Sequence, residues 1–195
     1  MTDEKNQDGL GAIIKQIQGQ KHPPVHLWNP DFCGDLDMRI ARDGTWFYMG
    51  SPIGRKPLVK LFSGVIRLDE NEKYYLVTPV EKIGITVDDA PFVAVEMFCE
   101  GEGREQILSF RTNVDDFVIM DADHPFRIEI DPETKEPAPY VRVRSNLDAL
   151  IARSVFYDLV NLAAEEDIKG NRIFGFWSSG QFFELGLMDD IFDNR

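Results

Sequence analysis

Alternating apolar and polar residues predict a β-hairpin centred near residue 43. Two alternating runs, 36–42 and 45–49, flank the dipeptide Asp43-Gly44, which tolerates the positive φ angles of a two-residue turn. Successive side chains of a strand point to opposite faces, so this turn sorts the hairpin into two sets. The polar and aromatic set comprises Asp35, Asp37, Arg39, Trp46 and Tyr48. The apolar set, expected in the core, comprises Leu36, Met38, Ile40, Phe47 and Met49.

A short amphipathic helix is predicted directly after this hairpin. Its apolar residues recur at the spacing of one helical face: Leu58, Leu61, Phe62, Val65 and Ile66. The N–H groups at the start of such a helix attract anions, and Arg55 and Lys56 stand beside them. The preceding loop is not a Walker A motif, because three rather than four residues separate Gly50 from Gly54 and Pro57 replaces the Ser or Thr.

The remaining pattern predicts more strands, a longer helix and a closing hairpin. Strands are expected at 74–78, 83–87, 92–100, 106–112, 117–120, 126–130 and 140–144. Ser145 with Asp148 three residues later resembles a helix cap, so a helix is predicted from residue 147 to about 165. Two final strands, 173–177 and 182–185, flank a turn at Ser179-Gly180. Together these elements indicate an α+β fold whose strands are mostly antiparallel.

Two stretches of the chain share one predicted order of elements. Residues 35–87 and 126–186 each run hairpin, helix, strand, strand, which predicts two related lobes with a groove between them. Such a groove is a natural ligand site. We therefore expect a tail with a short helix at 1–20, an N-terminal α+β domain at 21–80 and a C-terminal domain at 81–195.

Nine residues are predicted to line that interdomain site. The first lobe is expected to contribute Arg39, Trp46, Tyr48, Arg55, Lys56 and Glu81, and the second Tyr140, Arg142 and Arg144. Guanidinium groups beside aromatic rings can hold a planar ligand. The alternative, in which the aromatic side chains are buried under another layer and Asp37 pairs with Arg39, stays open at this point.

Charge is distributed unevenly along the chain. Residues 38–67 hold six basic side chains and one acid, although the net charge of the 195 residues is −13. A basic island in an acidic protein would attract a small anion while the protein as a whole repels nucleic acid and anionic membranes. Pairing of these cations with neighbouring acids is an equally good interpretation.

Few residues suggest chemistry of other kinds. His22, His26 and Cys33 are poor metal ligands as a set, because prolines prevent one helical face and no fourth ligand is near. The pairs Asp88-Asp89 and Asp115-Asp116 are typical of turns. No cofactor is therefore expected. Two cysteines, no membrane-length apolar run and no signal-peptide pattern predict a cytoplasmic protein.

Three runs of sequence resemble a known bacterial family. They are WNPDFCGDLDMRIARDGTWFYMGSPIGR, YYLVTPVEKIGITVDDAPF and PYVRVRSNLDALIARSVFYDLV, and the similarity to the domain-of-unknown-function family 1285 spans about residues 22–186. The resemblance implies a duplicated-motif fold whose C-terminal domain is superficially like a pleckstrin-homology barrel. It also implies an interdomain site for a nucleotide-like ligand and a role in signal transduction, and it implies no catalytic residues.

The leading hypothesis is a small-ligand binding or sensor protein. Arg39, Arg55 and Lys56 would hold a phosphate or carboxylate, and Trp46 would stack on a ring. One alternative is a protein-interaction adaptor that uses an exposed sheet edge or the aromatic residues of the last hairpin: Phe176, Trp177, Phe182 and Phe183. A metal-dependent hydrolase using Asp35, Asp37 or Glu81 is the weakest hypothesis, since no catalytic triad or metal motif accompanies these acids.

Overall fold

The computed structural model describes residues 23–130, 135–168 and 170–187. The predicted short helix at residues 1–20 and His22 lie outside these ranges. The chain divides into two compact units, Met1–Pro91 and Phe92–Arg195. The predicted division at residue 80 differs from this one, because the strand after it pairs with strands of the N-terminal unit.

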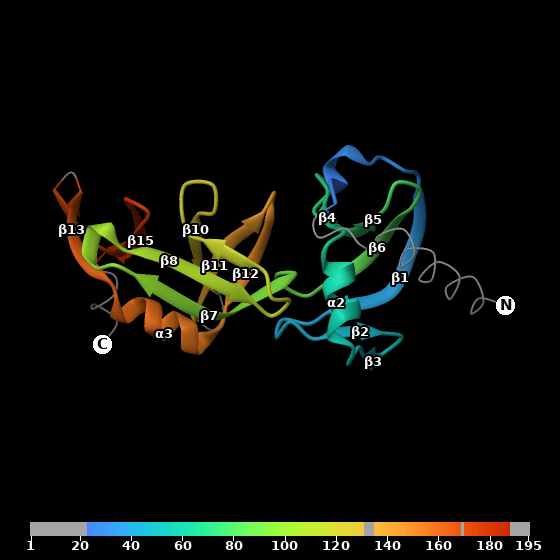
Figure 1. The fold of residues 1–195 in the computed structure, drawn as a ribbon, viewed down its shortest axis with the longest axis horizontal. Coiled ribbons are helices and arrows are strands. Elements are labelled where there is room, and N and C mark those ends of the chain that lie inside the picture. Colours follow the sequence, from blue (N-terminus) through green and yellow to red (C-terminus); the bar gives the residue numbers. More distant parts are fainter. Residues whose placement is uncertain (1–22, 131–134, 169, 188–195) are drawn as a thin grey trace. The chain divides into compact units, whose positions relative to one another are not determined.

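The N-terminal unit contains one six-stranded sheet and the helix α2 (Figure 1). A 3-10 turn, η1, covers Val25–Leu27, and α2 covers Lys56–Ser63. The strands are β1 (Phe32–Ile40), β2 (Trp46–Tyr48), β3 (Ser51–Pro52), β4 (Ile66–Leu68), β5 (Tyr74–Val77) and β6 (Lys82–Val87). The predicted helix is confirmed, but it ends near Gly64, so Ile66 starts a strand instead of extending the helical stripe.

The C-terminal unit contains a second six-stranded sheet, a three-stranded sheet and the helix α3. Its first sheet comprises β7 (Phe92–Glu100), β8 (Ile107–Thr112), β9 (Phe117–Ile119), β10 (Phe126–Ile130), β11 (Pro137–Arg144) and β12 (Leu147–Ile151). The turn η2 covers Gly103–Glu105 and α3 covers Arg153–Asn161. The small sheet comprises β13 (Ala164–Ile168), β14 (Asn171–Ser178) and β15 (Gln181–Leu187).

The two large sheets share one strand order. The first runs β3-β2-β1-β6-β5-β4, and the second, read from its β9 edge, runs β9-β8-β7-β12-β11-β10. Each consists of two antiparallel three-strand meanders joined by one parallel pair, β1 with β6 or β7 with β12. The two units are therefore similar, but the related segments are β1–β6 and β7–β12. The predicted repeat of residues 126–186 was framed wrongly, because β10–β12 pair with β7 whereas β13–β15 form a separate sheet.

The register of the first hairpin differs by one residue from the prediction. Ala41 and Thr45 close a three-residue loop in which Gly44 has a φ of 82°, a turn known from hairpins with a left-handed third residue. Ile40 then lies opposite Trp46, and Met38 lies opposite Tyr48. A one-residue shift moves every side chain of a strand to the other face.

The shift reverses the predicted faces of β2. Trp46 joins the buried face with Ile40 and is 1% exposed, and Phe62 of α2 stacks on it with ring centroids 6.4 Å apart. Phe47, predicted in the core, lies opposite Arg39 on the outer face, and Met49 is 48% exposed. The predicted pairing of faces was therefore wrong for this strand.

The predicted helix at 147–165 was wrong at both ends, since α3 ends at Asn161 and the strand β13 begins at Ala164. Arg144 and Leu147 pair across a tight turn, and Ser145 has a left-handed φ of 48°, so Ser145 closes a hairpin and caps no helix. Leu147, Ala149 and Ile151 are buried in alternation, as a strand requires. The helix begins only at Arg153. The predicted hairpin at Ser179-Gly180 is confirmed, with Ser178 opposite Gln181.

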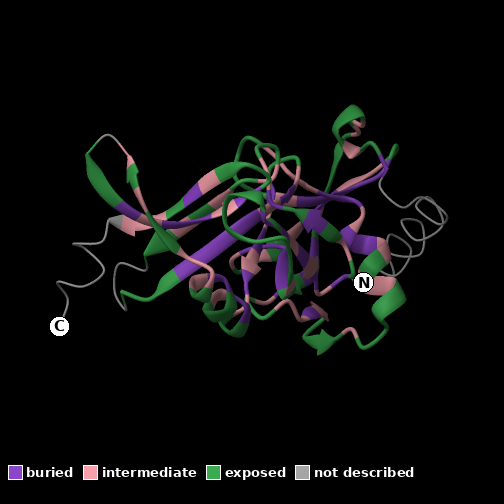
Figure 2. Ribbon diagram, turned by 60° about the vertical axis from the view of Figure 1, so that its left-hand side comes forward, coloured by how far each residue is buried: buried purple, intermediate pink, exposed green. Residues whose placement is uncertain are grey.

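Burial follows the strands in both units (Figure 2). The N-terminal core gathers Met38, Ile40, Phe62, Ile66 and Leu76. The C-terminal core gathers Phe92, Leu108, Phe110, Ala149 and Phe176, with α3 in contact with β7 and β14. No helix within the described residues is long and apolar enough to cross a membrane.

We predict that Gly44→Ala lowers the free energy of unfolding by about 1–2 kcal/mol, because a side chain with Cβ is strained at its left-handed φ. Asn tolerates this conformation better, so Gly44→Asn serves as the matched variant and should lose clearly less. Urea unfolding of the three proteins measures both effects. Equal stability of the alanine variant and the parent would contradict the three-residue loop.

Candidate functional site

Arg39 lies on the outer face of β1 and is bonded to an acid from a distant turn. Its Nε donates to Asp88 Oδ1 at 2.8 Å, and its guanidinium also contacts Oδ2 of the same carboxylate. This hydrogen bonding lowers the pKa of Asp88. Arg39 therefore neither pairs with Asp37 nor shares a face with Trp46, and the aromatic ring beneath it belongs to Phe47, 5.6 Å from the guanidinium carbon.

Trp46 and Tyr48 are two residues apart on β2, so their side chains point to the same face of the sheet. This is the inner face, which α2 covers. The indole Nε1 of Trp46 and the hydroxyl of Tyr48 are both buried, and neither has a hydrogen-bond partner among the described residues. Buried polar atoms in proteins are paired in the great majority of cases. Two such groups two residues apart on one strand therefore mark this place as a candidate site.

Glu81 presents a third buried atom of this kind. It precedes β6 and continues the ladder opposite Thr78, since Thr78 N–H donates to the Glu81 carbonyl at 2.9 Å. Its side chain therefore points to the same face of the sheet as those of the buried pair Leu76 and Ile83. The carboxylate oxygen Oε2 is buried without a hydrogen-bond partner in the described part of the chain.

The loop between β2 and α2 carries exposed cations. It is fixed to the hairpin because Ile53 N–H donates to the Trp46 carbonyl at 2.7 Å, and Tyr48 pairs with Ser51. Arg55 is the residue before α2 and Lys56 is its first residue. Both are exposed, and no ion pair holds either side chain within the described ranges. They stand at a helix start, where backbone N–H groups favour negative charge.

The three predicted residues of the C-terminal unit lie on β11. Arg142 Nε contacts Asp148, and another guanidinium nitrogen donates to the Ser145 carbonyl at 2.9 Å. Arg144 Nη1 contacts Asp116 Oδ2 at 2.7 Å. Burial lowers the pKa of Arg144, while Asp116 opposes this change.

Tyr140 is 5% exposed, and the guanidinium carbon of Arg127 lies 4.0 Å from its ring centroid. All three β11 side chains thus have partners inside their own unit. The prediction that the two lobes share a binding groove stays a prediction.

Within the described part of the chain, three of the six basic side chains in residues 38–67, the basic island, form ion pairs. Arg42 contacts Asp89 at 3.0 Å, Arg39 contacts Asp88, and Arg67 contacts Asp69. The Asp88-Asp89 turn, read from the sequence as turn chemistry alone, therefore also neutralises two arginines. What the island presents to an anion is mainly the pair Arg55 and Lys56.

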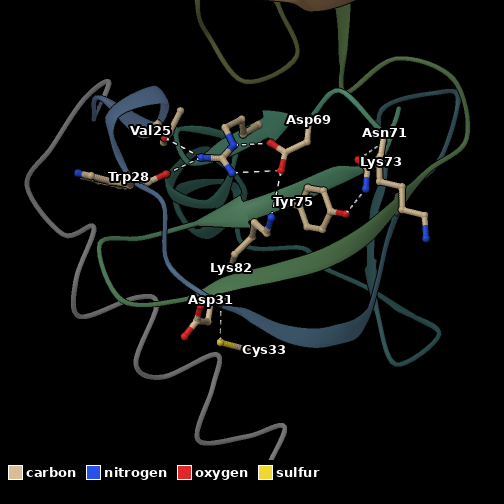
Figure 3. A network of polar contacts seen from close by, with 10 residues as sticks. Val25, Trp28, Asp31, Cys33, Asp69, Asn71, Lys73, Tyr75 and Lys82 are labelled. Atoms are coloured by element: carbon tan, nitrogen blue, oxygen red, sulfur yellow. Dashed lines mark hydrogen bonds and ion pairs between the residues drawn. The ribbon is translucent and has the colours of Figure 1, made fainter.

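Sequence reasoning missed a polar network that joins Val25 and Trp28, before β1, to Asp69 and Lys82 (Figure 3). Arg67 donates to the carbonyls of Val25 and Trp28 at 3.1 and 2.6 Å, so it holds the segment before β1 against β4. Asp69 accepts from Arg67 and, at 3.2 Å, from Lys82 Nζ. The partners are up to 42 residues apart, and only the acid two positions after the arginine was visible in the sequence.

Comparison with known proteins fits this architecture. Models of the N-terminal and C-terminal domains of the protein of unknown function DUF1285 match residues 23–90 and 91–185. The chain belongs to the DUF1285 family. The boundary between these matches lies one residue before the division of the structure after Pro91.

Two crystal structures of DUF1285 family proteins resemble this one. The protein from Silicibacter pomeroyi DSS-3 is 52% identical, with a TM-score of 0.86 over 94% of this chain and 97% of that chain. The protein from Shewanella baltica OS155 is 22% identical, with a TM-score of 0.52 over 65% of this chain and 91% of that one, and supports the fold alone. No curated protein matches the sequence.

Metal ligation finds no support in the described residues of this DUF1285 protein. No group of three or more His, Cys, Asp or Glu side chains there is placed to hold an ion. Cys33 is exposed and its thiol lies 3.4 Å from the Asp31 carbonyl. The acids Asp35, Asp37 and Glu81 do not assemble into a cluster of that kind.

The network predicts a pH-dependent contribution to stability. Burial raises the pKa of Asp69, but hydrogen bonds from Arg67 and Lys82 outweigh it and lower the pKa overall. A carboxyl whose pKa is lower in the folded state stabilises the fold above its unfolded pKa of about 3.9 and loses that contribution as the pH falls further. Asp69→Asn should therefore lower the free energy of unfolding by about 2 kcal/mol at pH 7, with a shrinking difference below pH about 4.

Urea unfolding of the parent and the variant from pH 7 down to pH 3 measures this difference. Glu70→Gln is the matched control, because it removes the same charge from the next residue, which is exposed. A difference for Asp69→Asn that stays constant down to the lowest pH would contradict an ionised Asp69 as the centre of the network.

Proposed function

We propose that this DUF1285 protein binds a small anionic ligand through its N-terminal unit. The site would comprise β2, the loop after it and the start of α2. The observation that carries the proposal is the pair of buried, unpaired polar atoms on β2, Trp46 Nε1 and Tyr48 OH. Glu81 Oε2 is a third such atom, but it lies at the opposite end of β6 from the β2 pair and is not part of this site.

Unpaired buried groups are costly to the fold. Each one costs about 1–3 kcal/mol relative to its hydrogen-bonded state. Natural proteins keep such groups mainly where a ligand, an ion or ordered water completes them. An indole N–H requires an acceptor, a carboxylate requires a donor, and a phenol serves as either. A ligand that completes the β2 pair must therefore offer an acceptor to the Trp46 indole.

The charge of the proposed ligand follows from the loop. Arg55 and Lys56 are exposed cations at the start of α2, and a phosphate or carboxylate there gains their charge and a favourable position in the helix dipole. Arg39, Arg142 and Arg144 are left out of the site, because Asp88, Asp148 and Asp116 already bind them. The net charge of −13 disfavours a nucleic-acid polymer as ligand.

The finer parts of the proposal rest on the family resemblance. They are a nucleotide-like ligand, a role in signal transduction and a likeness of the C-terminal domain to a pleckstrin-homology barrel. A nucleotide fits these requirements, since its base offers acceptors to the indole and its phosphate is anionic. Trp46 cannot stack on the base as first expected, because its ring is covered by Phe62 and is 1% exposed.

The first test is thermal unfolding of the full chain against separate mononucleotides, cyclic nucleotides, dinucleotides, inorganic phosphate and carboxylic acids. A ligand at about 100 times its Kd adds about 2.7 kcal/mol, which raises the unfolding temperature by several degrees in a protein of this size. An unfolding temperature that no compound of the panel raises would overturn the proposal.

Variants locate the site of any ligand found. Tyr48→Phe should weaken binding about 2-fold to 10-fold while leaving the ligand-free protein as stable or more stable, because it removes a buried hydroxyl that lacks a partner. Arg55→Gln and Lys56→Gln should weaken binding further at low salt, whereas Lys73→Gln removes an exposed charge of the same unit as a control. If Tyr48→Phe destabilises the free protein and leaves binding unchanged, ordered water completes the hydroxyl and the assignment of Tyr48 is wrong.

A further inference from the structure

The second large sheet exposes apolar side chains on its outer face. On β8 and β9 the residues alternate between a buried set and an outward set, and residues 96–100 of β7 pair with β8 in the same alternation of faces. Leu108, Phe110 and Val118 point inward and are at most 4% exposed. The outward set includes four apolar side chains: Phe98, Ile107, Phe117 and Ile119, which are 41%, 40%, 68% and 50% exposed.

These four side chains form one contiguous surface, here called the outer patch. Phe98 lies opposite Ser109, which lies opposite Ile119 on β9. The rings of Phe98 and Phe117 are 6.2 Å apart between centroids. Ile107 follows on the neighbouring row, opposite Glu100. A solvated sheet face normally carries polar side chains, and large contiguous apolar surfaces mark interaction sites.

The surroundings of the outer patch are acidic. Residues 92–120 contain six acids and two arginines, and one of these acids, Asp116, binds Arg144 of β11. Arg104 is bound to Glu166, and Arg111 is bound to Glu96 and Asp115. Glu100 lies on the outward face beside Ile107 and forms no ion pair within the described ranges. The patch is therefore apolar at its centre with an excess of negative charge at its rim.

We propose that the outer patch binds a basic amphipathic helix of a partner protein. Apolar sheet faces are covered by helices or by other sheets in folded domains, and a helix with one apolar stripe supplies such a cover. Lysine or arginine residues beside the stripe would meet Glu100 and the neighbouring acids, which provides charge complementarity. This interaction is separate from the ligand site of the N-terminal unit and goes beyond the proposed function.

A second copy of the chain is a poorer occupant. Two identical patches would bring the same acidic rims together, and both chains carry a net charge of −13, so like charges oppose their association. The last hairpin, considered as an adaptor surface from the sequence, is also excluded as the main contact. Phe176 and Phe183 are 0% and 5% exposed, and the Trp177 indole donates to Glu166 at 2.9 Å.

The test uses the full chain labelled with ¹⁵N and a synthetic 14-residue helical peptide of leucine and lysine with one apolar stripe. Two peptides serve as controls: one with glutamate in place of lysine, and one with the same composition but no stripe. We expect the lysine peptide alone to shift the amide resonances of β7, β8 and β9, with an affinity that falls as salt is raised.

Substitutions test the surface itself. The double variant Phe117→Ser, Ile119→Ser should weaken binding of the lysine peptide at least 10-fold, and Glu100→Gln about 2-fold to 5-fold. Ile130→Ser is the matched control, because Ile130 is 58% exposed on the opposite edge strand of the same sheet. The amide spectrum of each variant verifies its fold, and Glu100→Gln keeps the test valid should the double variant unfold.

Three results would overturn the proposal. Equal binding of the peptide without a stripe would mean that charge alone attracts it. Equal loss of affinity in Ile130→Ser would remove the patch as the binding surface. A dimer in sedimentation analysis of the free chain that dissociates in the Phe117→Ser, Ile119→Ser variant would identify a second copy as the occupant.

Discussion

The register of the β1–β2 hairpin determines what the N-terminal unit can do. Because the loop contains three residues and ends at a left-handed Gly44, the side chains of Trp46 and Tyr48 enter the interior instead of joining Arg39 on the outer face. Burial of their polar atoms follows from that single residue of register. The same register places the loop after β2 so that Ile53 binds the Trp46 carbonyl and α2 begins beside it.

Ion pairing then decides which charges remain for a ligand. Asp88, Asp89 and Asp69 bind three of the arginines that made the basic island conspicuous, and Asp116 and Asp148 bind the two arginines of β11. Each of these acids lies in a turn or strand, and at least one of the residues that contact it is distant in sequence. The sequence alone suggested that these five arginines were available to a ligand. In the structure they have a structural role instead, because they hold turns against strands.

Local patterns predicted the elements better than their partners. The helix at α2, the hairpin at Ser179-Gly180 and most strands could be placed from periodicity and turn residues, since these depend on neighbours in the chain. The predicted length of the first hairpin loop was wrong because Asp43-Gly44 fits both a two-residue and a three-residue turn. The helix predicted for residues 147–151 was wrong because their apolar positions fit helical spacing as well as the alternation of a strand. Ser145 likewise suits either a helix cap or a tight turn. The parallel pairs β1–β6 and β7–β12 join distant segments and left no local pattern.

The two sheets show how one strand order supports different surfaces. In the N-terminal unit the helix between β3 and β4 packs on the sheet and covers Trp46, so the polar atoms there are sealed from bulk water and require partners. In the C-terminal unit the connection from β9 to β10 contains no helix, and the covering helix α3 comes after β12 and contacts β7 and β14. The inward sides of β7, β8 and β9 are buried, and their outward sides are exposed with apolar residues on them. A shared topology therefore fixes the strand positions, while the side chains on each face decide whether that face becomes an interior with unpaired polar groups or an exposed apolar surface.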